Sequence, residues 1–194
     1  GSSLYLKAGQ LVTVEQLLYG MMLHSGNDAA AALAIVLAGS QAAFVAAMND
    51  RAGELGLAGT RFANPHGLDD EENYSTARDL GRLAAAAMEN EDFRRVVSAK
   101  SYDFAGRSLR NHNKLLWQVE GAVGVKTGYT KAAGRILVSA AERQGRRLIA
   151  VTIHDPDDWA DHPALLEYGF GQMTEARPVA EGQLLGAVPV TGGT

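Results

Sequence analysis

The sequence predicts an α+β fold in which helices pack on an antiparallel sheet. Before Val123, apolar residues recur mostly at the spacing of amphipathic helices, and from Val123 onward the period changes to two. Helices that precede a run of neighbouring strands are typical of α+β domains rather than of alternating α/β ones. A length of 194 residues with 46% apolar residues suits one globular domain, or one domain and part of a second.

The helices are expected from caps and apolar periodicity. Thr13 and Gln16 form a capping box, so the first helix is expected to begin at Thr13. The tetrapeptide Ser25-Gly26-Asn27-Asp28 interrupts this helix, and its last residue is suited to begin the second one. Ser40 is expected to cap the third helix. The expected helices cover residues 13–25, 29–38, 40–55, 75–88, 93–97 and 159–170.

Three strands are expected near the end of the chain. They cover Val123–Thr130, Ile136–Ala141 and Leu148–His154, and the segment Glu142-Arg143-Gln144-Gly145 supplies the turn between the last two. A small hairpin is expected over residues 102–109, and a loop over residues 61–70. Beyond Met173, proline and glycine punctuate short Val/Leu pieces, which indicates the start of a further β-rich unit.

Composition excludes several function classes. The net charge is −4 and the basic residues are scattered, so we expect no nucleic-acid partner. Cysteine is absent, which removes disulfides, thiolate nucleophiles and cysteine-based zinc sites. The histidines lack zinc-helix spacing, so no metal and no cofactor is expected. The longest apolar run, Ala29–Ala38, is too short to span a bilayer.

Lys126-Thr127-Gly128-Tyr129 is the first segment whose residues suggest chemistry. A lysine beside a threonine hydroxyl can bind a carboxylate, one as a charge and the other as a hydrogen-bond donor. Gly128 allows a ligand backbone to lie against the strand, and the Tyr129 N–H can face a developing oxyanion. Taken alone, this segment is weak evidence, because an exposed strand end with a glycine kink would more often account for the same residues.

Ser25-Gly26-Asn27 is the second such segment, at the break between two expected helices. A serine hydroxyl there can relay a proton, and the asparagine amide offers both a donor and an acceptor. The alternative is an ordinary helix–loop–helix junction, because serine and asparagine are common caps. The two segments occurring together in this order are far more specific than either alone.

With its flanking segments, the chain resembles the low-molecular-mass penicillin-binding proteins, the serine-type D-alanyl-D-alanine carboxypeptidases. The similarity runs from about Gly1 to Met173. Besides the two motifs, it rests on the lead-in helix 17–24 and three further segments. These are Thr60-Arg61-Phe62-Ala63-Asn64-Pro65-His66-Gly67-Leu68, Tyr74-Ser75-Thr76-Ala77-Arg78-Asp79-Leu80 and Asn111-His112-Asn113-Lys114-Leu115-Leu116.

The resemblance implies a helix-and-antiparallel-sheet fold of the penicillin-binding and β-lactamase type, and roles for particular residues. Ser25 would help move protons to the leaving amine, and Asn27 would bind the substrate amide. Lys126 and Thr127 would seat the terminal carboxylate, Gly128 would admit the peptide, and the Tyr129 N–H would be one oxyanion donor. We expect His112, upstream of Lys126, to line the same cleft; the alternative for this residue is an exposed position in a loop. The implied substrate is a peptidoglycan stem peptide ending in D-Ala-D-Ala, with β-lactams as further ligands and an extracytoplasmic location.

One family element has no counterpart. These enzymes acylate through the serine of a Ser-x-x-Lys motif, and none occurs in the 194 residues. We therefore expect residues 1–174 to be a partial catalytic domain without its N-terminal strands and nucleophile helix. Residues 175–194 would begin a truncated C-terminal β-rich domain. The missing motif would lie in the rest of a longer protein or in a separate chain. The alternatives are a non-catalytic peptide- or β-lactam-binding module and, less favoured, a β-lactamase.

Overall fold

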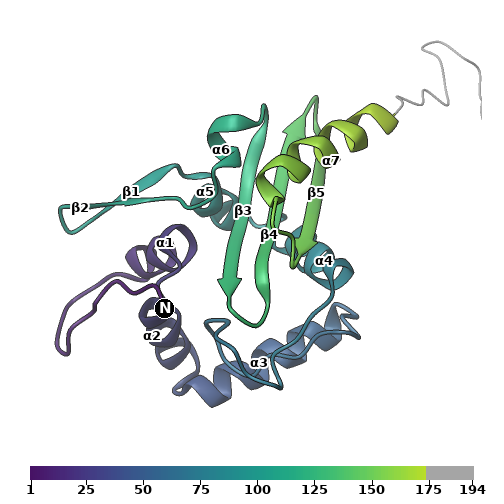
Figure 1. The fold of residues 1–194 in the computed structure, drawn as a ribbon. Helices are drawn as coiled ribbons and strands as arrows, with labels where there is room; N and C mark the ends of the chain where they lie inside the picture. The colour runs from purple at the N-terminus through teal and green to yellow at the C-terminus, as the bar shows by residue number, and fades with distance from the viewer. Residues whose placement is uncertain (174–194) are drawn as a thin grey trace, which may run out of the picture.

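The computed structural model describes residues 1–173, so the expected C-terminal β-rich unit lies outside the described residues. Five helices precede a small hairpin, and a three-stranded sheet and a final helix follow (Figure 1). The elements are α1 (Val14–His24), α2 (Asn27–Ala38), α3 (Gln41–Glu54), α4 (Ala77–Ala87), α5 (Glu91–Ser98), β1 (Ser101–Phe104), β2 (Arg107–Arg110), α6 (Leu115–Gln118), β3 (Ala122–Thr130), β4 (Gly134–Arg143), β5 (Arg146–Ile153) and α7 (Asp158–Gln172).

The antiparallel sheet has the order β3-β4-β5 and carries helices on both faces (Figure 1). Alternate side chains of a strand point to opposite faces, and β4 shows this directly. Val138 and Ala140 pack in a core cluster with Met88 at the end of α4. Ser139, between them, contacts α7 through His162. The predicted α+β fold, with helices against an antiparallel sheet, is therefore confirmed.

The sharp corner between α1 and α2 consists of only two residues. Thr13 and Gln16 form the predicted capping box at the start of α1. At its end Ser25 adopts the left-handed conformation with φ 57°, and the Gly26 N–H donates to the Gly20 carbonyl. The helix α2 begins at Asn27 after Gly26 as N-cap, so the expectation that Asp28 begins it was wrong by one residue.

Asp28 instead fastens the N-terminal segment to this corner. Its carboxylate accepts hydrogen bonds from the Ser3 hydroxyl at 2.8 Å and from the backbone N–H groups of Leu4 and Leu6 at 2.8 and 3.0 Å. Leu4 is buried in the core cluster beside Leu17 of α1. Polar and apolar contacts thus hold residues 1–6 against the α1–α2 corner.

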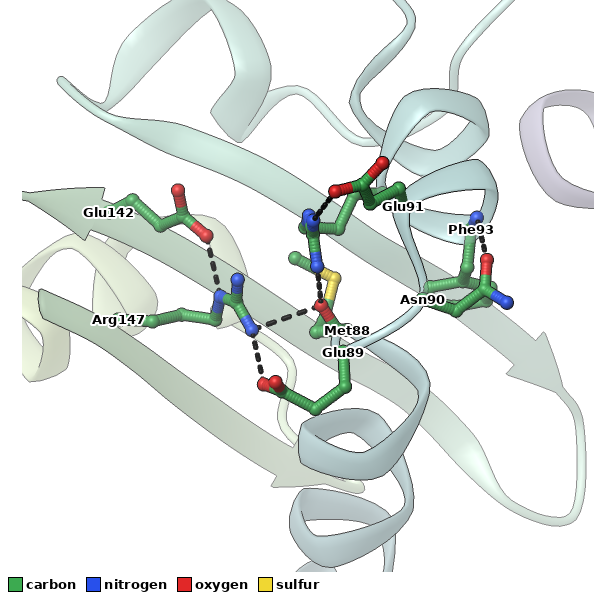
Figure 2. A network of polar contacts seen from close by, with 8 residues as sticks. Met88, Glu89, Asn90, Glu91, Phe93, Glu142 and Arg147 are labelled. Atoms are coloured by element: carbon green, nitrogen blue, oxygen red, sulfur yellow. Dashed lines mark hydrogen bonds and ion pairs between the residues drawn. The ribbon is translucent and has the colours of Figure 1, made fainter. Parts of the chain in front are cut away.

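Arg147 of β5 joins the sheet to the turn between α4 and α5 (Figure 2). Its guanidinium donates to the Met88 carbonyl at 3.0 Å and forms ion pairs with Glu89 and Glu142. Arg94 of α5 donates to the same carbonyl at 2.6 Å. Two cationic donors therefore satisfy a carbonyl that the end of α4 leaves free, and they tie this helix end to α5 and β5.

For the remaining elements, the structure differs from the prediction mainly at the ends of helices and turns and in one short helix. The strands and the hairpin are confirmed, and the β4–β5 turn narrows to Gln144 and Gly145, both with positive φ as a two-residue hairpin requires. The short helix α6 was not predicted. In α7 the apolar side chains of Leu165 and Tyr168 are exposed, whereas His162 and Asp158 are buried.

Within the described residues, no single helix is long and apolar enough to cross a membrane. Only when α2 and α3 are counted together is a segment long and apolar enough, and these two helices meet at an angle of 85°.

Candidate active site

The two motifs, 101 residues apart in the chain, meet at the corner between α1 and α2. The ammonium group of Lys126 on β3 donates a hydrogen bond to the hydroxyl of Ser25, and a second one to the Thr127 carbonyl at 2.7 Å. The left-handed turn at Ser25 aims its side chain outward from the helix end toward β3. A hydroxyl and an amine in direct contact can exchange a proton, which is what general acid–base chemistry requires.

Lys126 is electrostatically unusual. Burial lowers the pKa of its ammonium group from the ordinary 10.5 to about 8. No carboxylate pairs with it among the described ion pairs, so desolvation is not offset by an opposite charge. Near neutral pH the group is charged and attracts an anion, yet it can lose its proton at modest cost.

The geometry of β3 determines where a ligand carboxylate could contact both Lys126 and Thr127. In register, Lys126 lies opposite Val138 and Thr127 opposite Leu137, so their side chains leave the strand on opposite faces. A carboxylate that contacts both must therefore lie along the edge of β3. In the described part of the chain this edge carries no further strand, because β3 pairs with β4 alone.

Backbone groups also point to this edge. The Thr127 carbonyl faces Lys126 and Ser25, away from β4. Residues two apart in a strand present their N–H and C=O groups to the same side, so the N–H of Tyr129 faces the edge as well. Gly128, between them, is exposed, and the side chain of Tyr129 is 70% exposed. The edge thus offers a charge, a hydroxyl and an N–H donor in succession.

His112 reaches the corner from the loop between β2 and α6. Its backbone N–H donates to the Leu23 carbonyl at 3.2 Å, and its ring lies 5.3 Å from that of His24. Burial lowers the pKa of His112, and the nearby His24 and Lys126 lower it further. His112 therefore stands beside Ser25 and Lys126 as a neutral side chain near pH 7.

Asn27 occupies the first turn of α2, two residues after Ser25. Its backbone N–H donates to the Ser2 carbonyl at 3.0 Å, and its side-chain amide lies against Gly1. The structure thus brings Ser25 and Lys126 into direct contact and places Asn27, Thr127 and His112 next to them. Gly128 and Tyr129 lie farther along the strand.

Sequence reasoning missed two sets of residues that hold this site. Asp28 secures the corner. Asn111 and Asn113 secure the loop that carries His112: the Asn111 amide donates to the carbonyls of Val97 and Ala99 at 3.2 and 2.9 Å, and its oxygen accepts from the Asn113 N–H. The alternation Asn-His-Asn was the available signal, because asparagine side chains commonly bond backbone N–H groups two residues ahead.

Among residues 1–173, no group of three or more His, Asp or Glu side chains is arranged to hold a metal ion. Asp158, the first residue of α7, pairs with Arg135 of β4.

Comparison with known proteins agrees with this geometry. Residues 1–157 match the family described as D-alanyl-D-alanine carboxypeptidase, Peptidase_S11. The chain is 38% identical over 196 residues to the D-alanyl-D-alanine carboxypeptidase DacA of Escherichia coli K12, which covers 98% of this chain and 49% of that protein. It is 41% identical over 188 residues to a D-alanyl-D-alanine carboxypeptidase of Streptomyces sp. K15, covering 87% of this chain and 65% of the relative.

Solved structures give the same result. The Streptomyces K15 DD-transpeptidase superposes with a TM-score of 0.84 at 38% identity, covering 88% of this chain and 72% of that one. A D-alanyl-D-alanine carboxypeptidase of Mycobacterium tuberculosis H37Rv gives 0.81 at 37% identity, covering 88% and 69%.

The fold and the site define the class of penicillin-binding DD-peptidases. The chain belongs to the D-alanyl-D-alanine carboxypeptidase family, and it spans about half the length of the E. coli relative that it matches.

Proposed function

We propose that this chain forms the substrate-binding and proton-relay part of a serine D-alanyl-D-alanine carboxypeptidase that acts on peptidoglycan stem peptides. The observation that carries the proposal is the hydrogen bond between Lys126 and Ser25, which joins two motifs that are distant in sequence. Family membership supports the same reaction, since hydrolysis of a terminal D-Ala requires a carboxylate seat and a proton donor for the leaving amine.

Each group has a role in this reaction. The charge of Lys126 and the hydroxyl of Thr127 bind the terminal carboxylate at the edge of β3. The Tyr129 N–H donates to the oxygen of the scissile carbonyl as negative charge develops there. Ser25 passes a proton toward the leaving amine, with Lys126 as its partner, because an amine of pKa about 8 exchanges protons readily near neutral pH. Asn27 binds the peptide amide, and Gly128 leaves room for the peptide backbone.

The nucleophile in this proposal is the serine of a Ser-x-x-Lys motif that the 194 residues do not contain. It belongs to another segment of the complete protein or to a separate chain. It attacks the carbonyl between the two D-alanines, the bond to the terminal D-Ala breaks, and water then hydrolyses the resulting ester. β-Lactams acylate the same serine, and the complete protein works outside the cytoplasm, where peptidoglycan lies.

Two experiments test the proposal. This chain should bind an acetylated peptide ending in D-Ala-D-Ala, and Lys126→Ala should abolish binding while Arg78→Gln, which removes an exposed charge on α4, should not. The complete protein carrying the Ser-x-x-Lys motif should be labelled covalently by a fluorescent penicillin. If it is not labelled, the acyl-enzyme mechanism is wrong.

The absence of the nucleophile favours a second candidate, a non-catalytic module that binds D-Ala-D-Ala peptides or β-lactams. Such a module would keep the Lys126-dependent peptide binding described above. The two candidates separate when the complete protein is incubated with the peptide, because only the enzyme releases free D-alanine.

A further inference from the structure

A groove of about 550 Å³ lies beside the site, between β2 and α6. Among residues 1–173, the side chains that line it include two cations, a tryptophan and no carboxylate. The lining residues are Arg110, Asn111, His112, Lys114, Trp117 and Gln118.

Within residues 1–173, the cations of this groove form no ion pair with an acidic side chain. Arg110 and Lys114 line it, and Lys100 reaches the same Trp117 ring from outside, yet none of the three takes part in an ion pair among residues 1–173. Every ion pair found in that range uses an arginine elsewhere. On a chain of net charge −4, such a cluster creates a local positive potential that attracts anions.

Trp117 gives the groove an ordered wall. Its side chain is 41% exposed, the Arg110 guanidinium lies 4.8 Å from the ring centroid, and the Lys100 ammonium lies 5.8 Å from it. Cations over an indole ring are held in place by its negative face, while their remaining N–H donors stay free. A ligand carboxylate entering the groove would therefore meet the Arg110 guanidinium already held in place, while the Lys114 ammonium lies over another ring, 5.4 Å from the centroid of Trp159.

His112 connects the groove to the Ser25–Lys126 corner. It lines the groove, its N–H bonds Leu23, and its ring contacts His24, the residue before Ser25. The helix α6 also contacts β3, which begins four residues after Gln118. The groove thus continues the site toward the start of β3.

The direction of β3 shows which part of a substrate would face this groove. A terminal carboxylate at Lys126 and Thr127 and a scissile carbonyl at the Tyr129 N–H place the leaving residue toward Lys126. The peptide that precedes the scissile bond then extends the other way, toward Thr130. The groove therefore lies on the leaving-group side.

We propose that the groove is a subsite for a leaving residue that carries a second carboxylate, bound by Arg110 and Lys114. The inference rests on the function proposed above and extends it to substrates whose leaving group is larger and more acidic than D-alanine. The groove is larger than the methyl side chain of D-alanine requires. The positive charges of Arg110 and Lys114 favour a side-chain carboxylate over the corresponding amide.

Binding to the chain tests this without turnover, since the 194 residues contain no Ser-x-x-Lys serine. Two acetylated peptides are compared by calorimetry, one ending in D-Ala-D-Glu and the other in D-Ala-D-Gln, which have the same shape and differ by one charge. We expect the D-Glu peptide to bind about fivefold more tightly at low salt, as an exposed ion pair typically provides. The preference should shrink at 1 M salt.

Variants assign the preference to the groove. The double variant Arg110→Gln/Lys114→Gln should lose the preference for D-Glu while binding the D-Gln peptide as before. Arg78→Gln, on a different surface, should keep it. Lys126→Ala should lose both peptides, because it removes the seat for the terminal carboxylate that they share.

The outcomes separate the two proposals. Equal affinity for the two peptides, or a D-Glu preference that survives in the double variant, overturns the subsite while the D-Ala-D-Ala function stands. If none of the peptides binds, neither the one ending in D-Ala-D-Ala nor those ending in D-Ala-D-Glu or D-Ala-D-Gln, then the subsite and the proposed function are both overturned.

Discussion

Replacing Lys126 by methionine should make the folded chain more stable at neutral pH. The drop in pKa from 10.5 to about 8 corresponds to roughly 3 kcal/mol, because each pKa unit represents about 1.4 kcal/mol of preference for the neutral form. Methionine has a similar shape and no charge to desolvate. Since the change also removes the hydrogen bonds to Ser25 and Thr127, we expect a net gain of roughly 1–3 kcal/mol in the free energy of unfolding.

The pH dependence gives the sharper measurement. Between pH 8 and 10.5 the unfolded chain still holds the Lys126 proton while the folded chain has released it, so the stability of the parent rises with pH in this window. The penalty is fully present below pH 8 and absent above 10.5. Urea unfolding of the parent and of Lys126→Met at pH 7, 8, 9 and 10 should therefore show a difference that closes as pH rises. Other groups titrate alike in both proteins and cancel.

A stability difference that stays constant across these pH values would refute the reasoning, because it would show that Lys126 carries no buried charge at neutral pH. Lys126→Met should also fail to bind the D-Ala-D-Ala peptide. Stability and function would then oppose each other at one residue, as is common where a site holds a poorly solvated charge.

Three further outcomes are expected. Asp28→Ala should lower the free energy of unfolding in urea by about 2–3 kcal/mol, because it leaves backbone N–H groups of the N-terminal segment without an acceptor. Burial raises the pKa of Asp28, but its hydrogen bonds lower it to a net value below 3.8. The stability that Asp28 provides is therefore lost only in strong acid. Ser25→Gly should be about 1 kcal/mol more stable than Ser25→Ala, because glycine tolerates the left-handed turn. Burial lowers the pKa of His162 below 6.5, so the parent should lose stability more steeply than His162→Gln as pH falls from 7 to 5 in thermal unfolding.

Local signals in the sequence predicted most of the fold. The capping box at Thr13, the alternation after Val123 and the glycine of the β4–β5 turn each act over a few residues, so the structure reproduces them. The four-residue helix α6 is too short to show an apolar period, and its Leu115 and Leu116 are buried by parts of the core that lie elsewhere in the sequence.

The site was predictable to a lesser degree. No spacing rule connects Ser25 to Lys126 across 101 residues, and the resemblance of the two motifs to a family suggested the pairing that the structure contains. The role of Asp28 was missed because its partners lie 22 to 25 residues earlier in the chain. The cationic groove was missed for a similar reason, because it forms only when the end of β2 and the helix α6 come together in the fold.

In the described part of the chain no strand covers the outer edge of β3, and this edge influences how the protein behaves in concentrated solution. A strand with unpaired backbone groups can pair with any extended chain, including the same strand of a second copy, and this is a common beginning of aggregation. Here the edge carries Lys126, and the exposed Lys131 follows the strand end. Two such edges brought together would oppose like charges, whereas a peptide ending in a carboxylate would neutralise one. The positive charge that attracts a ligand carboxylate to this edge therefore also opposes pairing of two copies through it.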